Sequence, residues 1–285
     1  MKYHLPGGKR SLAVPMVLAL ALLVTGCGRV RENPAPQAVP EPATMRLAVY
    51  YLKLDERNAY LVREVHEVPK TSAVARAALE ELIRGEPVTP GARRVLPPDT
   101  RVLGIKIENG LATVDFSKEV LRANVGAAGE ALGIQSIVNT LTEFSQIDRV
   151  AFTVEGRLDQ AARDWWGHVG LYGQPFRRDL SQVWEPAIWV TSPAPGTTVA
   201  SPLVVRGSAM VFEGTVQGRV VAEGGRVLAQ GFTTATVGAP GRGDFELRLD
   251  FPAPPEKTGW VEVYSISAED GREEHLVRVP VRFGG

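Results

Sequence analysis

The stretch VLGIKIENGLATVDF, residues 102–116, decides the fold of the first half of the chain. Its centre is Asn109-Gly110, and Asn-Gly is the strongest short signal for a β-hairpin because both turn residues must tolerate a positive φ. In the second arm Ala112, Val114 and Phe116 alternate with other residues, so they share one face of a strand. The stretch therefore predicts an antiparallel hairpin with one face against a core.

Further strands and helices are predicted on both sides of this hairpin. Two segments rich in Val, Leu and Tyr precede it around a turn-like DERN sequence, and two segments with apolar residues at helical spacing surround it. The order ββαββαβ predicts an α+β domain over residues 45–181, with helices on one side of a mainly antiparallel sheet. The predicted elements are strands at 46–54 and 59–68, a helix at 71–84, the hairpin, a helix at 130–145 and a strand at 149–155.

The second half of the chain has no helical periodicity after Pro186. About seven short strand-like segments, separated by Gly and Pro, follow in about 100 residues, which is typical of an immunoglobulin-like sandwich. A second cysteine for the disulfide of antibody domains is absent. We therefore predict an all-β immunoglobulin-like sandwich over residues 187–285, after a short boundary.

The N-terminus has the features of a bacterial lipoprotein signal. Residues 12–24 form an apolar run of about 13 residues, the length of a signal-peptide core and too short for a membrane-spanning helix. Basic residues precede the run, and Cys27, the only cysteine of the chain, follows it. We expect residues 1–26 to be a signal peptide and Cys27 to carry lipid such as palmitate. The alternatives are an ordinary secretory signal with a chance cysteine, or an uncleaved anchor.

The segment at 27–44 is predicted to be a tether. It contains four prolines among small and polar residues, so it cannot form a core and favours an extended spacer. With lipid on Cys27, the folded part is expected to be extracytoplasmic and anchored to the cell membrane.

Composition and motifs argue against several classes of function. The 32 Lys and Arg residues balance the 32 Asp and Glu residues, whereas a nucleic-acid binder normally has a basic surface. The chain has no G-x-S-x-G elbow, and His66-Glu67 is followed by Val68-Pro69, which is incompatible with a helical H-E-x-x-H metal site. We therefore expect neither a metal site nor a cofactor.

The first domain resembles the GerMN domain of sporulation and spore germination proteins. The resemblance covers nearly all of residues 45–180 and is carried by VREV (62–65), LIRG (82–85), VDFSKE (114–119), TLTEF (140–144) and VEG (154–156).

The second domain, over about 187–283, resembles the immunoglobulin-like domain of bacterial spore germination, through SPL (201–203), FEG (212–214) and residues near 192–196, 207–209 and 267–271. The two resemblances imply a non-enzymatic scaffold or accessory factor at the cell envelope, with envelope or spore-associated proteins as partners.

Five residues form a candidate binding surface. Gln135, Asn139 and Glu143 recur every four residues on the predicted second helix, where they either bind a partner or sugar or form a solvated face. Trp165 and Trp166 either stack on a sugar ring or anchor a partner, or else they cover the junction between the domains. This surface motivates the alternative hypothesis of a module that binds peptidoglycan or a small ligand.

A third hypothesis is a glycan hydrolase, which requires two carboxylates on either side of the bond that is cleaved. Asp115, Glu119 and Glu143 are the candidates. We favour a structural role for Asp115, in which it binds backbone groups at the end of its strand.

Overall fold

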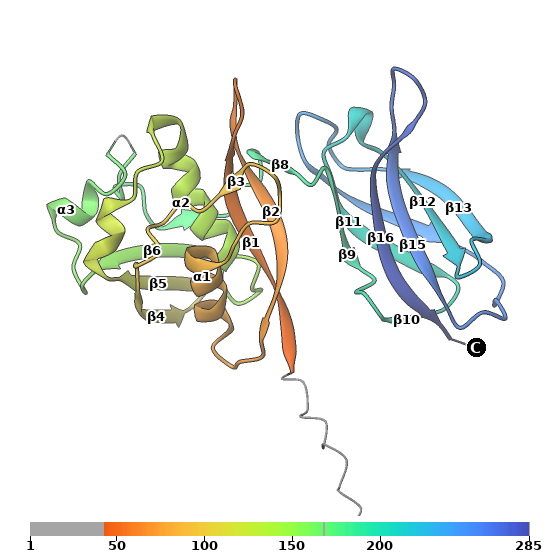
Figure 1. The fold of residues 1–285 in the computed structure, drawn as a ribbon, viewed down its shortest axis with the longest axis horizontal. Coiled ribbons are helices and arrows are strands. Elements are labelled where there is room, and N and C mark those ends of the chain that lie inside the picture. Colours follow the sequence, from red (N-terminus) through yellow and green to blue (C-terminus); the bar gives the residue numbers. More distant parts are fainter. Residues whose placement is uncertain (1–42, 168, 285) are drawn as a thin grey trace, which may run out of the picture. The chain divides into compact units, whose positions relative to one another are not determined.

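The computed structural model describes residues 43–167 and 169–284 (Figure 1). The predicted signal peptide, Cys27 and almost all of the tether therefore lie outside the described residues. The first domain contains two four-stranded sheets, and the second contains two sheets of five and three strands. The α+β domain followed by an all-β domain is confirmed.

The first sheet of the α+β domain is built on a long antiparallel pair. β1 (Thr44–Leu54) pairs with β2 (Ala59–Pro69) along their whole lengths, and the strand order is β3-β1-β2-β8. The two edge strands are short: β3 is Ala92–Arg93 and β8 is Val183–Glu185. Consequently, most of the outer edge of both long strands has no neighbouring strand.

The second sheet has the order β4-β5-β6-β7 and contains the predicted hairpin. β4 (Val102–Glu108) and β5 (Leu111–Phe116) are antiparallel, and Asn109 and Gly110 have φ of 49° and 77°, as a two-residue hairpin turn requires. β6 (Arg149–Val154) is parallel to β5, and β7 (Phe176–Arg177) closes the sheet.

The helices join these sheets around one core. α1 (Val74–Arg84) contacts β1, β2 and β4, while α2 (Ala127–Leu141) contacts strands of both sheets. The predicted ββαββαβ order is thus confirmed, but the strands form two sheets instead of one. The reason is that β6 returns beside β5 after the α2 crossover, whereas β1 and β2 pair only with each other and with short edge strands.

Shorter helical segments complete the α+β domain. They are a 3-10 turn, Lys118–Arg122, and the short helix α3, Gln160–Arg163. The helix predicted at 130–145 begins three residues earlier and ends four residues earlier than expected. After Leu141 the chain continues in turns, because the backbone N–H of Phe144 donates to the carbonyl of Leu141, three residues back.

The second domain is a sandwich of two sheets, as expected. One sheet has the order β10-β16-β15-β12-β13 and the other β14-β11-β9, and buried residues such as Val205, Leu247 and Val261 form its core. The strands are β9 (Ile188–Ser192), β10 (Thr198–Val199), β11 (Leu203–Ala209), β12 (Thr215–Ala222), β13 (Val227–Thr234), β14 (Gly243–Leu249), β15 (Thr258–Ile266) and β16 (Glu273–Phe283).

Candidate functional site

Side chains cap one exposed edge of the first sheet. Tyr50 of β1 directs its backbone away from β2, and α2 supplies a partner for each group. The N–H of Tyr50 donates to Thr140 Oγ1 at 3.2 Å, and the carbonyl of Tyr50 accepts from Ser136 Oγ at 2.5 Å. Both hydroxyl groups are buried. The edge of β1 is therefore closed to an additional strand at this point.

Two edges of the second sheet are capped in a similar way. The side-chain amide of Gln174 lies beside β6, where Phe152 N donates to its Oε1 at 2.8 Å and Phe152 O accepts from its Nε2 at 3.4 Å. On β4, Arg76 of α1 donates to the carbonyls of Val102 and Leu103. These caps occupy backbone groups that would otherwise pair with another strand.

The outer edge of β2 also keeps backbone groups without a partner among the described residues, as β4 does at Ile105 and Ile107 and β1 does at Ala48. Leu61 donates its N–H to the carbonyl of Gln182, next to β8. Because backbone groups alternate sides along a strand, Arg63, Val65 and Glu67 direct their N–H and C=O groups to the same side as Leu61. The bridge between Val62 and Glu185 pairs the N–H of Arg63 with the carbonyl of Glu185. Beyond that bond, no strand among the described residues pairs with β2 on this side, and no side chain caps the C=O of Arg63 or the outward groups of Val65 and Glu67.

The amino-acid sequence explains where the pairing of β8 ends. β8 is parallel to β2 and stops at Glu185, and the next residue is Pro186. Proline has no N–H, so it cannot continue a strand ladder. The uncapped segment of β2, residues 63–67, is called the β2 edge below.

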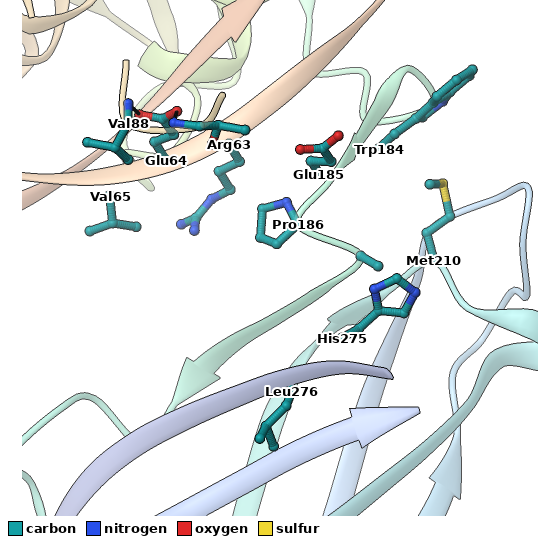
Figure 2. Close-up of a pocket in the computed structure, with 12 residues that line it drawn as sticks. Arg63, Glu64, Val65, Val88, Trp184, Glu185, Pro186, Met210, His275 and Leu276 are labelled. Atoms are coloured by element: carbon teal, nitrogen blue, oxygen red, sulfur yellow. Dashed lines mark hydrogen bonds between the residues drawn. The ribbon is translucent and has the colours of Figure 1, made fainter. Parts of the chain in front are cut away.

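An open groove of about 700 Å³ runs beside the β2 edge. In Figure 2, Arg63 and Val65 point to one side of the strand and Glu64 points to the other, towards Val88. Val65 is 40% exposed and Val88 is 76% exposed. The groove is lined by Arg63, Glu64, Val65, Val88, Thr89, Trp184, Glu185, Pro186, Ala187, Met210, His275 and Leu276.

A histidine between two carboxylates supports one face of β2. Nε2 of His66 lies 2.7 Å from Glu64 Oε2, and its Nδ1 lies 2.7 Å from Glu81 Oε1 on α1. Burial lowers the pKa of His66, but the hydrogen bonds to Glu64 and Glu81 outweigh it, and the net shift is upward. Glu64 also accepts the N–H groups of Val88 and Thr89, at 2.9 and 2.8 Å. This cluster fixes the loop after α1 beside the strand.

A second ionic cluster supports the other face. Arg63 binds Glu143 through two hydrogen bonds of 3.2 and 3.0 Å, and Arg178 and the Tyr50 hydroxyl donate to the same carboxylate. Burial by itself raises the pKa of Glu143. Arg63, Tyr50 and Arg178 lower this pKa by a larger amount, so the net value is about 2. Glu143 is thus a partly buried anion that holds the end of α2 against β1 and β2.

Trp189 lies between two guanidinium groups. The guanidinium carbons of Arg63 and Arg242 are 4.8 and 4.1 Å from the centre of its ring. Arg242 also donates to the carbonyls of Val183, Pro186 and Ala187. Burial lowers the pKa of Arg242 to about 10. These contacts fix the chain directly after β8.

The structure does not place Trp165 and Trp166 on the surface. Their side chains are 2% and 5% exposed and lie in the core of the first domain, where Trp165 packs edge-on against Phe116 and Phe152. Trp166 covers Gly133 of α2 so closely that a β-carbon there would lie 1.2 Å from the ring. Buried indoles cannot stack on a sugar, which corrects this part of the candidate binding surface.

The three polar residues predicted on the second helix, Gln135, Asn139 and Glu143, form neither a ligand site nor a solvated face. Asn139 is fully buried and holds the chain after β7, since its amide binds Asp179 O and Asp179 N. Gln135 donates to Asn139 and to the carbonyl of Arg177. With Glu143 in its ionic cluster, all three side chains fix neighbouring segments to α2. The candidate surface predicted from these residues is therefore corrected to an internal polar network.

Asp115 has the structural role that was favoured for it. Its Oδ1 accepts from Thr153 Oγ1 and from the N–H of Gly156, both at 2.8 Å, at the end of β6. Glu119 follows in the 3-10 turn, 3.8 Å from Arg101. Glu143 is occupied by two arginines, so it is not a free partner for Asp115.

The described residues contain neither a metal-binding cluster nor a membrane-spanning helix. In residues 43–167 and 169–284, no group of three or more His, Cys, Asp or Glu side chains could hold a metal ion. No helix in that part of the chain is long and apolar enough to cross a membrane.

The β2 edge was missed from sequence. The 59–68 segment was predicted correctly as a strand, but its neighbours depend on β8, which lies more than 100 residues later. Pro186 was the one signal that could have indicated where the pairing ends.

Comparisons with known proteins agree with the predicted domain pair. Residues 48–160 match the family model for sporulation and spore germination, and residues 187–272 match that for the immunoglobulin-like domain of bacterial spore germination. The spore germination protein GerM of Bacillus subtilis (strain 168) is 40% identical over 110 residues, or 37% of this chain. The chain spans only 29% of that relative's length.

Two solved structures are also similar. The first GerMN domain of GerM from Bacillus subtilis is 33% identical, covers 47% of this chain and 96% of its own, and has a TM-score of 0.37. The tandem GerMN domains of the same protein are 23% identical, with coverages of 73% and 62% and a TM-score of 0.39. By these two matches, the chain combines a domain of the sporulation and spore germination type with an immunoglobulin-like domain of bacterial spore germination.

Proposed function

We propose that this protein is a non-enzymatic scaffold or accessory factor in sporulation or spore germination. The observation that carries the proposal is the presence of two germination-type domains on one chain. The 40% identity to a spore germination protein supports the same process. The proposed partners are other proteins of the cell envelope or the spore.

The proposal includes an extracytoplasmic location and a lipid anchor on Cys27. Both rest on the N-terminal sequence, where an apolar run of signal-peptide length precedes the only cysteine. Two or more acyl chains would make the anchor stable, since one chain alone binds a membrane only weakly.

The test is crosslinking in host cells with the tagged, full-length protein, followed by capture and mass spectrometry. A Cys27→Ser variant is the matched control. We expect discrete envelope or spore proteins with the natural chain and loss of most of them with the variant. A deletion strain that sporulates and germinates like its parent would contradict the proposed process. Turnover of a wall glycan by the purified protein, abolished by a point substitution, would contradict the non-enzymatic role.

A further inference from the structure

We propose that the β2 edge binds an extended, apolar segment of another protein, which adds to the first sheet as a strand. The inference rests on the proposed function, because it assumes that the chain has a protein partner. It adds which surface of the chain binds the partner and what chemistry the partner presents.

The first argument is the row of outward backbone groups on the β2 edge. Tyr50 of β1, Phe152 of β6 and Val102 of β4 all have outward backbone groups that side chains from other elements occupy. A strand edge is a template for pairing, and native proteins normally block it. The C=O of Arg63 and the N–H and C=O groups of Val65 and Glu67 point outward without such a cap among the described residues.

The second argument is the position of this edge. It lies along an open groove, so an additional strand has space beside β2 (Figure 2). Pro186 prevents β8 from extending along residues 63–67, so the chain's own strand does not fill that position. Binding by strand addition takes its affinity from main-chain hydrogen bonds and its specificity from alternate side chains.

The third argument concerns the partner's chemistry. Most charged residues beside the edge are already paired within this chain, Arg63 with Glu143 and Glu64 with His66, whereas Glu67 at the end of the edge is exposed and has no ion pair among the described residues. Glu185 is bound by Lys53 and by the Tyr60 hydroxyl, at 2.8 and 2.7 Å. A charged partner would have to break these pairs, whereas an apolar one would cover exposed groups such as Val65 and Val88.

The experiment places a photo-crosslinking amino acid at Val88, in the tagged full-length chain in host cells. The same amino acid at Leu103, an exposed position on β4 whose carbonyl accepts from Arg76, is the positional control. Adducts are mapped to the residue by mass spectrometry. We expect an adduct from position 88 and not from 103, joined to an extended apolar segment of another protein.

Backbone variants then test the mode of binding. Val65→Pro removes an N–H that makes no bond to β1, so the β1–β2 ladder is retained, whereas Val65→Thr keeps this N–H. We expect the adduct yield to fall at least tenfold with Val65→Pro and to change little with Val65→Thr. If thermal unfolding shows that Val65→Pro disturbs the fold, Glu67→Pro, closer to the end of β2, replaces it.

Several outcomes would overturn the inference. The first is an adduct whose yield is the same in the natural chain, Val65→Pro and Glu67→Pro. The second is an adduct that joins position 88 to this chain itself or to a second copy of it. A missing adduct, while whole-chain capture still recovers envelope proteins, would reject the β2 edge but leave the proposed function in place. If capture and photo-crosslinking both fail, the proposed function fails as well.

Discussion

At the scale of single residues, two ionic clusters fix β2 from its two faces. Glu143 accepts hydrogen bonds from Arg63, Arg178 and Tyr50, and His66 lies between Glu64 and Glu81. Buried charges are costly unless they are paired, so each cluster is stable only when it is complete. The two clusters make different predictions about pH.

We expect Glu143→Gln to lower the free energy of unfolding by about 3 kcal/mol at pH 7, because Arg63 loses its buried partner. The pKa of Glu143 lies at about 2 in the fold and at 4.5 ordinarily, so its contribution is present above pH 4.5 and is lost as the pH falls towards 2. The free energies of unfolding of the natural chain and the variant, measured with urea, should therefore become equal as the pH falls. Glu80→Gln, in an exposed pair with Arg76, is the control and should change stability by less than about 1 kcal/mol. A constant difference across this pH range would contradict the assignment.

His66 should have the opposite pH dependence. Its pKa is raised above 6.5, so its contribution is complete below pH 6.5 and is lost as the pH rises through the raised value. We expect the melting temperature of the natural chain to fall more steeply between about pH 6.5 and 9 than that of His66→Gln. His275→Gln, at an exposed histidine, is the control for the effect of the substitution itself. Parallel profiles for the natural chain and His66→Gln would show that His66 does not titrate in this cluster.

At the scale of elements, α2 organises the first domain. Its hydroxyl groups cap the edge of β1, its polar side chains fix the segment after β7, and Gly133 leaves space for Trp166. The helix thus contacts strands of both sheets and encloses one core.

The cap on β1 can be tested with Thr140→Val, which keeps the volume of the side chain but removes the acceptor for the Tyr50 N–H. A buried donor without a partner costs about 1–3 kcal/mol, and we expect a loss of that size in urea unfolding. Thr113→Val on β5 is the matched control, since no hydrogen bond of its hydroxyl group is present in the described part of the chain. Equal stabilities of the two variants would rule out the cap.

Gly133→Ala tests the packing of Trp166. In a helix, Ala is normally more stable than Gly by about 1 kcal/mol, but here its β-carbon would overlap the indole. We therefore expect the substitution to lower the melting temperature instead of raising it. In a Trp166→Ala background the same substitution should cost less, because the ring is absent. A stabilising effect in the natural background would contradict this packing.

At the scale of the whole molecule, the proposed membrane attachment depends on Cys27, which lies outside the described residues. We expect Cys27→Ser to move the protein from the membrane to the soluble fraction of host cells and to abolish incorporation of a labelled fatty acid. Fractionation with immunoblotting and metabolic labelling provide the measurement. Membrane retention of the variant at the natural level would indicate an uncleaved anchor instead of lipid.

The sequence by itself determined the order of the elements and the type of each domain. Asn109-Gly110 specified its hairpin, and the change from helical to alternating periodicity after Pro186 marked the start of the sandwich. These features are local, because propensity and periodicity act within a few turns of helix or a few strand residues.

Only the tertiary structure decided which strands pair, which polar side chains are buried and which edge stays open. Glu143 has the same local pattern as an exposed glutamate until Arg63, 80 residues earlier, is placed beside it. Trp165 and Trp166 are buried because Phe116, Phe152 and Gly133 surround them, although they follow a polar segment. The β2 edge likewise depends on the length of β8, far along the chain. Contacts between distant segments are set by packing of the whole core, and a local pattern does not contain them.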